Sequence, residues 1–464
     1  MLHERCGDRP DFFRTVVSAG IHGGQEQGEH MATGELGTVE QAVGMVRSVD
    51  SFAVGLGPAV PGELLHRLGD RDDFTQLEVF GALLPDLYAV FTKPGVHLRS
   101  GFFGPAERFL RDSGANIEFV PADFRGFEPI VRTLSPRVMA TAAAMPDADG
   151  FVSLSLHAGA TVAELHRCGA DPDRILLVEV SRHFPRTLGL PPEHTHRLHL
   201  DEIDLVFESD RPPFSLADAD ATPIEVAIAE NAARYITDGC TLQTGIGGVP
   251  SMVARMLAEG PGGDYGVHSE MFTTGLMHLH QAGKVSNQKG IFDGMSITTF
   301  AAGTPDLYEW LDGNEEVRFL PVSVVNSPET IARNRKMVTI NGAMAIDLSG
   351  QVVADTIKGK QFSGIGGHED FVSAPGLRLE DRSLLCLPAT ATVDGSVVSR
   401  IVPELLLGSI VSTPRHQVDV VITEHGAAEL KGKTIRERAA ALVSVAHPDF
   451  RDELASLGKT WPAD

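Results

Sequence analysis

Apolar residues recur along this chain with two alternating patterns, one typical of helices and one typical of buried strands. Residues 39–49 (VEQAVGMVRSV) show the spacing of an amphipathic helix, and residues 51–57 (SFAVGLG) form an apolar run that ends in glycines. A second helical segment, PGELLHRLG, follows at 61–69, and ILLVEVS at 175–181 is another short apolar strand. Strands that alternate with helices in this way predict an α/β fold, with a mainly parallel sheet covered by helices.

A stretch rich in proline and aspartate divides this pattern into two halves. Residues 208–223 (ESDRPPFSLADADATP) contain turn formers without apolar periodicity, and the helical segment IEVAIAENAARYI follows at once. We therefore expect an N-terminal domain over residues 33–220 and a C-terminal domain over residues 221–464. Residues 1–32 show no sustained period, and we expect them to be a disordered extension.

The two halves repeat the same order of features. VDSFAVGLGPAVPGELLHRL, from Val49, and ITDGCTLQTGIGGVPSMVARML, from Ile236, each combine a strand, a G-x-G turn, a Val-Pro pair and a helix. MPDADGFVSLS, from Met145, and MAIDLSGQVVAD, from Met344, share a methionine, an aspartate-bearing turn, a glycine and a strand. The common order favours two similar open α/β domains, although common turn residues can also coincide by chance.

The net charge and the distribution of apolar and cysteine residues exclude several classes of binding partner and site. The 464 residues carry a formal net charge of −23, which repels phosphate backbones and anionic lipids, so we expect neither nucleic acid nor a membrane as a partner. No apolar run approaches the ~18 residues of a membrane span, and the N-terminus lacks the apolar core of a signal peptide. The four cysteines form neither a disulfide framework nor a zinc motif, so we expect a cytoplasmic protein without a metal site.

Two glycine-rich loops are candidates for ligand binding. Each lies at a predicted strand-to-helix turn, where the backbone can approach a ligand closely and free N–H groups favour an anion. The residues concerned are Gly245, Ile246, Gly247, Gly248, Val249, Gly364, Gly366 and Gly367. Taken alone, the first loop is equally well explained as a structural turn, because it lacks the features of a P-loop or a dinucleotide fingerprint. Two such loops can converge where adjacent strands of an open sheet end.

Glu270 is the candidate reactive carboxylate. It follows GVHS and precedes a helix that we expect to begin near Phe272. A carboxylate at a strand-to-helix turn can project into a cleft and act as a nucleophile or base. The same position also suits an acid that caps the helix, and position alone favours this capping interpretation.

The histidines indicate no additional site. His194, His196 and His199 have no carboxylate or cysteine at a matching metal-ligand spacing, so we expect a solvated loop there. His278 and His280 are two positions apart on a predicted helix and therefore cannot share a face.

Together these segments resemble the acetyl-CoA hydrolase/transferase family, which includes 4-hydroxybutyrate, acetate and butyrate CoA-transferases. The resemblance extends from about residue 50 to the C-terminal region and is carried by PADFRGFEP, MPDADGFVSLS, EVSRHFPRT, TGIGGVP, GVHSEMFTTGLMHLHQAG, VNSPETIARNRKMVTINGAMAIDLSGQVVAD and SGIGGHEDFVSAPG. The chain departs from the family pattern at residues 181–184 (SRHF) and 341–344 (NGAM). We expect these departures to affect the choice of acyl acceptor rather than the chemistry.

The resemblance implies a homodimer or higher oligomer that uses acyl-CoA and a small carboxylic acid as substrates, with no metal and no nucleotide cofactor. It implies that Glu270 forms a glutamyl-CoA thioester and that Asn326 lies near the reacting carbonyl. The glycines of both loops become oxyanion donors and coenzyme A-binding groups. The expected activity is therefore CoA transfer by a ping-pong mechanism.

Alternative functions remain open at this point. An acyl-CoA hydrolase is one, because His268 lies two residues before Glu270 and faces the same side of an extended strand, where it can activate water. A histidine packed beside the loop is the simpler interpretation of His268. A non-catalytic CoA- or metabolite-binding module is another, although such a module has no need of Glu270. A nicotinamide oxidoreductase is less well supported, because a correctly spaced GxGxxG is missing.

The internal repeat offers a rival carboxylate. Glu78 follows Gly55 at nearly the distance at which Glu270 follows Gly245. We expect Glu78 to be structural, because the first half of the chain has no loop like SGIGG.

Overall fold

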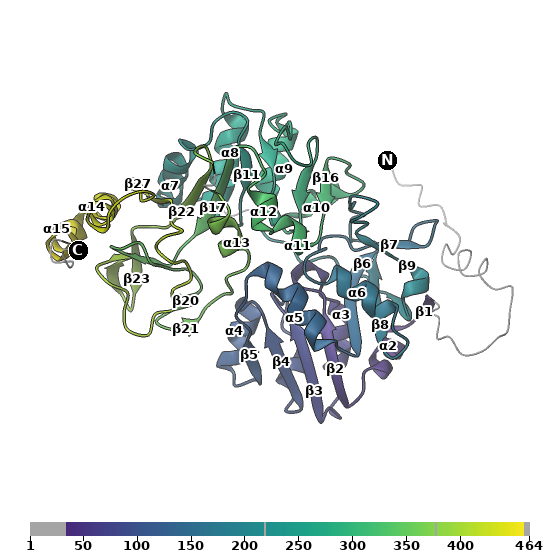
Figure 1. Cartoon of the computed structure of the whole chain (residues 1–464). Helices are drawn as coiled ribbons and strands as arrows, with labels where there is room; N and C mark the ends of the chain where they lie inside the picture. Colours follow the sequence, from purple (N-terminus) through teal and green to yellow (C-terminus); the bar gives the residue numbers. More distant parts are fainter. Residues whose placement is uncertain (1–33, 218–219, 376–377, 459–464) are drawn as a thin grey trace, which may run out of the picture.

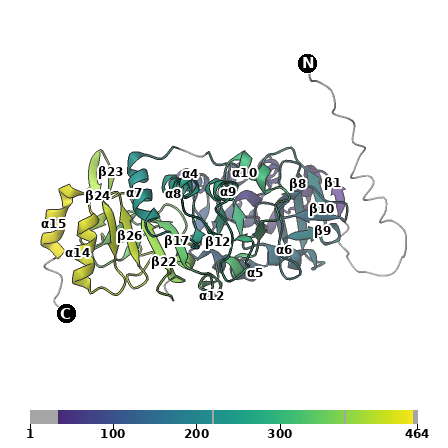
Figure 2. The same ribbon diagram turned by 90° about the horizontal axis from the view of Figure 1, so that it is seen from above.

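The computed structural model describes residues 34–217, 220–375 and 378–458. The expected N-terminal extension, residues 1–32, lies outside these described residues. Two α/β regions lie side by side and give the molecule an elongated shape (Figures 1 and 2). The first half of the sequence builds one region, the second half builds the other, and α14 and α15 lie at the far end of the second.

The first region is built on a parallel sheet of eight strands in the order β1-β10-β8-β6-β2-β3-β4-β5. Its strands are β1 (Glu35–Gly37), β2 (Val49–Val54), β3 (Gln76–Gly81), β4 (Val96–Ser100), β5 (Ile117–Phe119), β6 (Val138–Ala144), β8 (Ile175–Ser181) and β10 (Leu205–Glu208). Its helices are α2 (Val39–Met45), α3 (Gly62–Leu68), α4 (Pro105–Asp112), α5 (Phe127–Leu134) and α6 (Val162–Gly169).

Helices cover both faces of this sheet because successive residues of its strands point to opposite sides. Phe52 and Val54 of β2 pack with α2, α3 and α4 in one core cluster, whereas Ala53 packs with α5 and α6 in another. Strands that are apolar on both faces are typical of buried parallel sheets. This explains why the strands read as continuous apolar runs in the sequence.

The second region is built on six strands in the order β12-β11-β17-β22-β26-β27, parallel except for the last pair. These strands are β11 (Thr241–Gln243), β12 (Gly266–Val267), β17 (Met337–Gly342), β22 (Arg382–Cys386), β26 (Val420–Thr423) and β27 (Gly426–Glu429). Its helices are α7 (Pro223–Ala233), α8 (Gly248–Glu259), α9 (Thr274–Gln281), α10 (Pro305–Leu311), α11 (Val322–Val325), α12 (Pro328–Ile331), α13 (His368–Ser373), α14 (Ile435–Val445) and α15 (Pro448–Gly458).

Shorter strands complete both regions. They are β7 (Phe151–Ser153) with β9 (Arg197–His199), β13 (Met271–Phe272) with β15 (Phe300–Ala301), β14 (Ser296–Thr298) with β16 (Val317–Phe319), β18 (Ala345–Asp347) with β19 (Val352–Val353) and β25 (Ile401–Val402), β20 (Thr356–Ile357) with β21 (Lys360–Gln361), and β23 (Thr390–Val393) with β24 (Ser396–Ser399). The 3₁₀ turns are η1 (Gly57–Ala59), η2 (Ala89–Thr92), η3 (Phe124–Gly126) and η4 (Leu200–Glu202).

The two sheets share one strand order. An isolated parallel bridge between His268 and Ile297 extends the second sheet from β12 to β14, and β14 pairs with β16. The order β16-β14-β12-β11-β17-β22-β26 then corresponds, strand for strand along the sequence, to β5-β4-β3-β2-β6-β8-β10. The predicted α/β class with mainly parallel sheets is confirmed, and the common order supports duplication.

The structure shortens one predicted helix. The helix expected over residues 39–49 ends at Met45, because Val46 is extended and Val49 already begins β2. Val46 is buried in the same core as the helix, so the apolar periodicity continues past the helix end. Periodicity reports which residues face the core, and here the core-facing pattern spans a helix and the turn that follows it.

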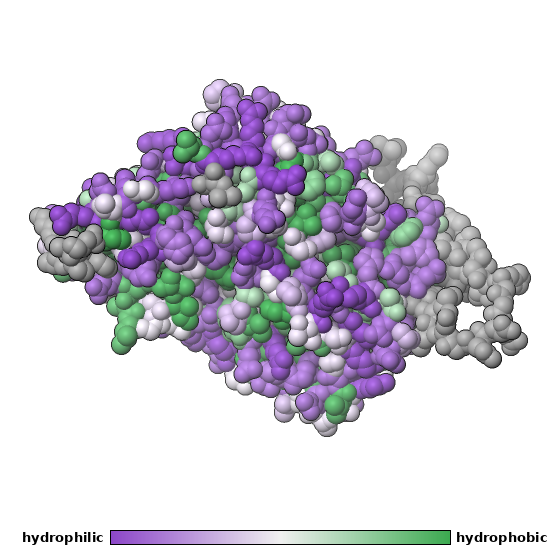
Figure 3. All heavy atoms as spheres, viewed as in Figure 1, coloured by the Kyte–Doolittle hydropathy of each residue, from purple (hydrophilic) through white to green (hydrophobic). Residues whose placement is uncertain are grey.

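The face of the molecule that Figure 3 shows is mainly hydrophilic. Exposed apolar side chains gather in the part of the second region that contains the β23–β24 hairpin, and they include Val397, Val398, Leu406, Leu407 and Ile410. Among the described residues, no helix is long and apolar enough to cross a membrane.

Candidate active site

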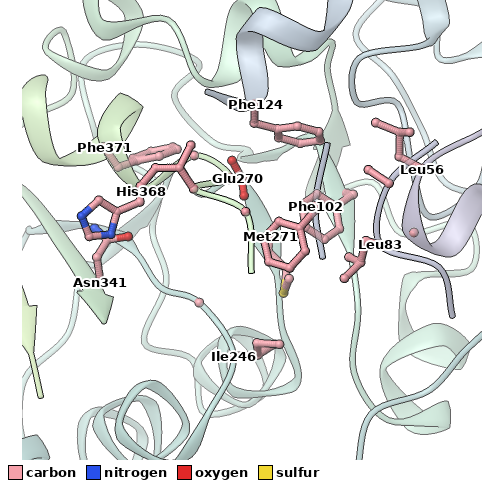
Figure 4. A pocket seen from close by; sticks show the side chains of 18 of the residues that line it. Leu56, Leu83, Phe102, Phe124, Ile246, Glu270, Met271, Asn341, His368 and Phe371 are labelled. Atoms are coloured by element: carbon pink, nitrogen blue, oxygen red, sulfur yellow. The ribbon is translucent and has the colours of Figure 1, made fainter. Parts of the chain in front are cut away.

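A cavity of about 340 Å³ lies where the two regions meet (Figure 4). Side chains of the first half of the chain form one of its walls, and the two glycine loops of the second half form much of the rest. The backbone N–H of Phe124 in η3 donates a hydrogen bond of 2.9 Å to the carbonyl of Gly366, which fixes the first region against the second glycine loop. The cavity is therefore shaped by contacts between the two halves.

Glu270 projects into this cavity from the segment between β12 and β13 (Figure 4). Its backbone carbonyl accepts hydrogen bonds from the N–H groups of Thr299 and Phe300, at 3.0 and 3.2 Å, and from the hydroxyl of Thr298 at 2.9 Å. Three donors to one carbonyl hold the backbone of Glu270 in place. Thr273 takes the N-cap position of α9, so the helix-capping interpretation of Glu270 is wrong.

Asn326 joins Glu270 to a second carboxylate. Its side-chain amide donates hydrogen bonds to Oε2 of Glu270 at 2.6 Å and to Oδ2 of Asp370 at 2.9 Å. Asn326 and Asp370 are fully buried, and Nε of Arg125 lies 2.8 Å from Oδ1 of Asp370. Arg125 belongs to the first half of the chain, so this series of hydrogen bonds and an ion pair spans both regions.

Burial changes the acidity of both carboxyl groups. It raises the pKa of Glu270 from 4.5 to about 7, while the Asn326 amide opposes this rise and the neighbouring Asp370 adds to it. Burial also raises the pKa of Asp370 from 3.8 to about 7. Two acidic groups that share one amide donor therefore titrate near neutral pH, which is typical of groups that gain or lose a proton during catalysis.

The second glycine loop lies directly against Glu270. A Cβ atom on Gly367 would lie 1.8 Å from Oε2 of Glu270 and 2.5 Å from Nδ2 of Asn326, so a side chain cannot fit there. Gly366 has φ +55°, which favours glycine, and its Cβ position lies 3.7 Å from Oε1 of Glu270. Gly364, Gly366 and Gly367 all line the cavity, as a ligand-binding loop requires.

The first glycine loop divides into two parts. Gly245 and Ile246 line the same cavity, and Gly247, with φ +116°, lies beside it at the N-cap of α8. Gly248 is the first residue of α8, and a Cβ atom there would lie 2.3 Å from a glutamate of α7. Val249 packs against the core of the second region. Gly248 and Val249 therefore lie within or against the second region itself, and only the start of the loop faces the cavity.

Sequence reasoning missed the contribution of the first half of the chain to the cavity. The side chains concerned are Leu56, Leu83, Phe102, Phe124, Phe127 and His157. One signal was available in the internal repeat, because Leu56 of the G-L-G turn has the same place in its half as Ile246 of TGIGG, and both line the cavity.

His268 is buried beside Glu270 rather than exposed to the cavity. Its Nε2 lies 2.8 Å from the carbonyl oxygen of Val325, and burial lowers its pKa to about 4. His268 is not among the residues that line the cavity. The simpler interpretation, a histidine packed beside the loop, describes this geometry.

The remaining candidates lie elsewhere. The prediction of a solvated loop is wrong for His196, which is buried and stacks on Phe319 at 5.1 Å between ring centroids. His278 is exposed, whereas His280 lies 2.8 Å from the Ser296 hydroxyl, as expected for two residues on different helix faces. Among the described residues, no group of three or more His, Cys, Asp and Glu side chains could hold a metal ion.

Glu78 occupies a different environment from Glu270. Its Oε2 lies 2.8 Å from Nδ1 of His97 and 3.6 Å from Nη2 of Arg99, and its side chain is 36% exposed. These ion pairs lie on β3 and β4, and Glu78 does not line the cavity. This placement agrees with the structural role expected for it.

Comparisons with known proteins agree with the family resemblance seen in the sequence. The Acetyl-CoA hydrolase/transferase C-terminal domain model matches residues 303–457. The chain is 34% identical to the 4-hydroxybutyrate coenzyme A transferase of Clostridium kluyveri, over 90% of this chain and 96% of that protein. It is 32% identical to the butyryl-CoA:acetate CoA-transferase of Anaerostipes caccae, over 92% and 97% of the two chains. The RipA structure from Yersinia pestis superposes with a TM-score of 0.82 and 29% identity, covering 97% of this chain and 99% of that chain.

These relatives and the fold define an enzyme that transfers CoA. The chain belongs to the acetyl-CoA hydrolase/transferase family.

Proposed function

We propose that this enzyme moves CoA from an acyl-CoA to a small carboxylic acid by a ping-pong mechanism through a glutamyl-CoA thioester on Glu270. The observation that carries the proposal is the position of Glu270, whose carboxylate faces a glycine loop at the centre of the cavity and is held by Asn326 at 2.6 Å. Acyl-CoA is therefore a substrate, and the reaction requires neither a metal nor a nucleotide.

The first half-reaction consists of two exchanges at a carbonyl carbon. The ionised Glu270 attacks the thioester carbonyl, a carbon–oxygen bond forms, and the CoA thiolate leaves, giving a mixed anhydride. The thiolate then attacks the glutamyl carbonyl and releases the first carboxylate, which leaves glutamyl-CoA on the enzyme. A second carboxylate reverses both steps. The energy of the thioester is retained at each stage.

Asn326 and the glycine loop supply the polar groups for these steps. The amide of Asn326 orients the carboxylate of Glu270, and the backbone N–H groups at Gly366 and Gly367 are candidates to stabilise the oxyanion. Each well-placed donor of this kind contributes on the order of 3 kcal/mol to the transition state. A glycine is required at 367 because a Cβ atom would occupy the space of the Glu270 carboxylate.

Transfer is favoured over hydrolysis by the surroundings of Glu270. Much of the cavity wall is apolar, and Phe102, Phe124 and Phe300 are among its lining residues. Such a wall limits the water that reaches the glutamyl thioester, whereas a second acid can enter with its own apolar tail. His268, the candidate activator of water, is buried and hydrogen-bonded to a backbone carbonyl.

We also propose how the chain is organised. The absence of helices and strands between β10 and α7, among the described residues there, supports a domain boundary near residues 220 and 221. The exposed apolar side chains near the β23–β24 hairpin support a homodimer or higher oligomer, because such patches are typical of protein–protein contacts. Three described cysteines, Cys168, Cys240 and Cys386, are free and buried, which supports a cytoplasmic location.

The test is an exchange assay with acetyl-CoA as donor and with isotopically labelled acetate, propionate, butyrate and succinate as acceptors. We expect new acyl-CoA to form with at least one acid, faster than free CoA appears without an acid. Glu270→Gln should lose this exchange, whereas the matched variant Glu78→Gln should retain it. Release of CoA at the same rate without an acid, and no new acyl-CoA with one, would contradict transfer and favour a hydrolase.

A further inference from the structure

The cavity has two chemically different sides, with Glu270 between them (Figure 4). On one side the labelled side chains are apolar and come mostly from the first half of the chain: Leu56, Leu83, Phe102, Phe124 and Met271. On the other side lie Asn341 and His368, together with Phe371. A reacting carbonyl carbon near Glu270 therefore has an apolar surface on one side and polar groups on the other.

The polar side suits the pantetheine arm of CoA. The side-chain amide of Asn341 donates a hydrogen bond to Oε1 of Gln243 at 3.3 Å, and Gln243 also lines the cavity. Nε2 of His368 lies 2.8 Å from the Thr413 hydroxyl. Side-chain amides and an imidazole can pair with the two amide groups of pantetheine, which would otherwise lose their hydrogen bonds to water.

The apolar side offers no positive charge. Within the part of the chain that the structure describes, neither lysine nor arginine lines the cavity. His157, the one titratable residue on this side, lies between Phe124 and Phe300, and burial lowers its pKa to about 3, so it is uncharged at neutral pH. Arg125 is directed to Asp370. A second carboxylate on a substrate would therefore lose its hydration without gaining a partner.

We infer that the acyl group of the substrate lies between Leu56, Leu83 and Phe102, and that the enzyme selects monocarboxylic acids with an uncharged, apolar tail over dicarboxylic acids. This inference rests on the proposed function, because it assigns the acyl group to the side of Glu270 opposite the polar groups. The cavity volume of 340 Å³ falls within the range of about 300–1,000 Å³ that is usual for small-molecule sites.

The decisive comparison uses acids of the same length. Valerate, glutarate and monomethyl glutarate all have a five-carbon acid chain, and only glutarate carries a second charge. With butyryl-CoA as donor, we expect kcat/KM for valerate to exceed that for glutarate by about 100-fold, because an unpaired charge must enter an apolar site. Monomethyl glutarate should recover much of this difference, because the ester removes the charge and keeps the five-carbon acid chain, with one methyl group added.

A charge added to the wall should change this preference. Leu83→Lys places an ammonium group on the apolar side, and the backbone at residue 83, with φ 53°, is equally unfavourable for leucine and lysine. The valerate-to-glutarate ratio should fall by about 10-fold or more. Leu87→Lys, at a side chain that is 45% exposed and outside this cavity, is the matched control and should keep the wild-type ratio.

The possible results distinguish the preference for monocarboxylic acids from the proposed CoA transfer itself. Equal use of glutarate and valerate by the wild-type enzyme would overturn the inference and leave the proposed function intact. Failure of every acid to form a new acyl-CoA would overturn the proposed function and the inference with it. If Leu83→Lys does not fold, the three acids tested on the wild-type enzyme still decide the question.

Discussion

Replacing Glu270 with glutamine should stabilise the protein above neutral pH while it removes transfer activity. The pKa of Glu270 is raised by burial from 4.5 to about 7, so the folded state holds a proton that the unfolded state releases. This contribution to stability is fully present below pH 4.5 and is lost as the pH rises through about 7. A rise of this size corresponds to about 3 kcal/mol, and glutamine carries no charge that could produce such a loss.

Urea unfolding of the wild type and of Glu270→Gln at pH 5 and pH 8 measures this effect. Glutamine can accept the hydrogen bond from Asn326 through Oε1, so packing at the site is kept. We expect the free energy of unfolding of the variant, relative to the wild type, to increase by about 2–3 kcal/mol between pH 5 and pH 8. Glu78→Gln, which changes a partly exposed carboxylate paired with His97, is the control and should show no such gain.

Two results would refute the reasoning. One is an equal effect of Glu270→Gln at both pH values, which would mean that Glu270 is not held in a desolvated site. The other is a loss of stability at pH 8, which would mean that the charged carboxylate is stabilised by its surroundings. In either case the catalytic role that we propose for Glu270 would need an explanation other than a carboxylate activated by burial.

The site supports three further predictions. Gly367→Ala should lower kcat/KM by about 100-fold, because its Cβ atom would displace Glu270; a folded variant with normal turnover would contradict this. Asp370→Asn removes a negative charge beside Glu270, so the acidic limb of the pH–kcat/KM profile should move to lower pH, and an unmoved limb would exclude coupling. Glu78→Gln should leave acetate exchange into acetyl-CoA unchanged, and a large loss would show that Glu78 does more than stabilise β3.

Much of the fold could be predicted because the buried strands of a parallel sheet are continuous apolar runs in the sequence. The apolar run of β8 and the repeated strand–turn–helix units can each be recognised from residues that are close together in the sequence. Apolar periodicity does not predict where helix α2 ends. Val46 follows the last residue of the helix and is still buried in the same core, so the apolar pattern continues past the helix end. His196 shows a similar limit, since a polar residue in a loop is buried here by Phe319, which lies far away in the sequence.

The site could be predicted only in part. Glycines can mark positions where the backbone closely approaches a ligand or another side chain. Gly367 is such a position, because it lies directly against Glu270, whereas Gly248 does not line the cavity. Position alone favoured a helix cap for Glu270, and only the family resemblance indicated otherwise. The apolar wall at Leu83 and Phe102 depends on how the two regions meet, and no local pattern reports that contact.

The central claim is that CoA becomes covalently attached to Glu270. Intact-protein mass spectrometry after incubation with acetyl-CoA, with and without borohydride, tests it most directly. We expect a mass gain of CoA less one water, located on the peptide that contains Glu270, and its replacement by an alcohol at that side chain after borohydride treatment. An enzyme that turns over acyl-CoA without any such adduct, or with the adduct on the peptide that contains Glu78, would contradict the account.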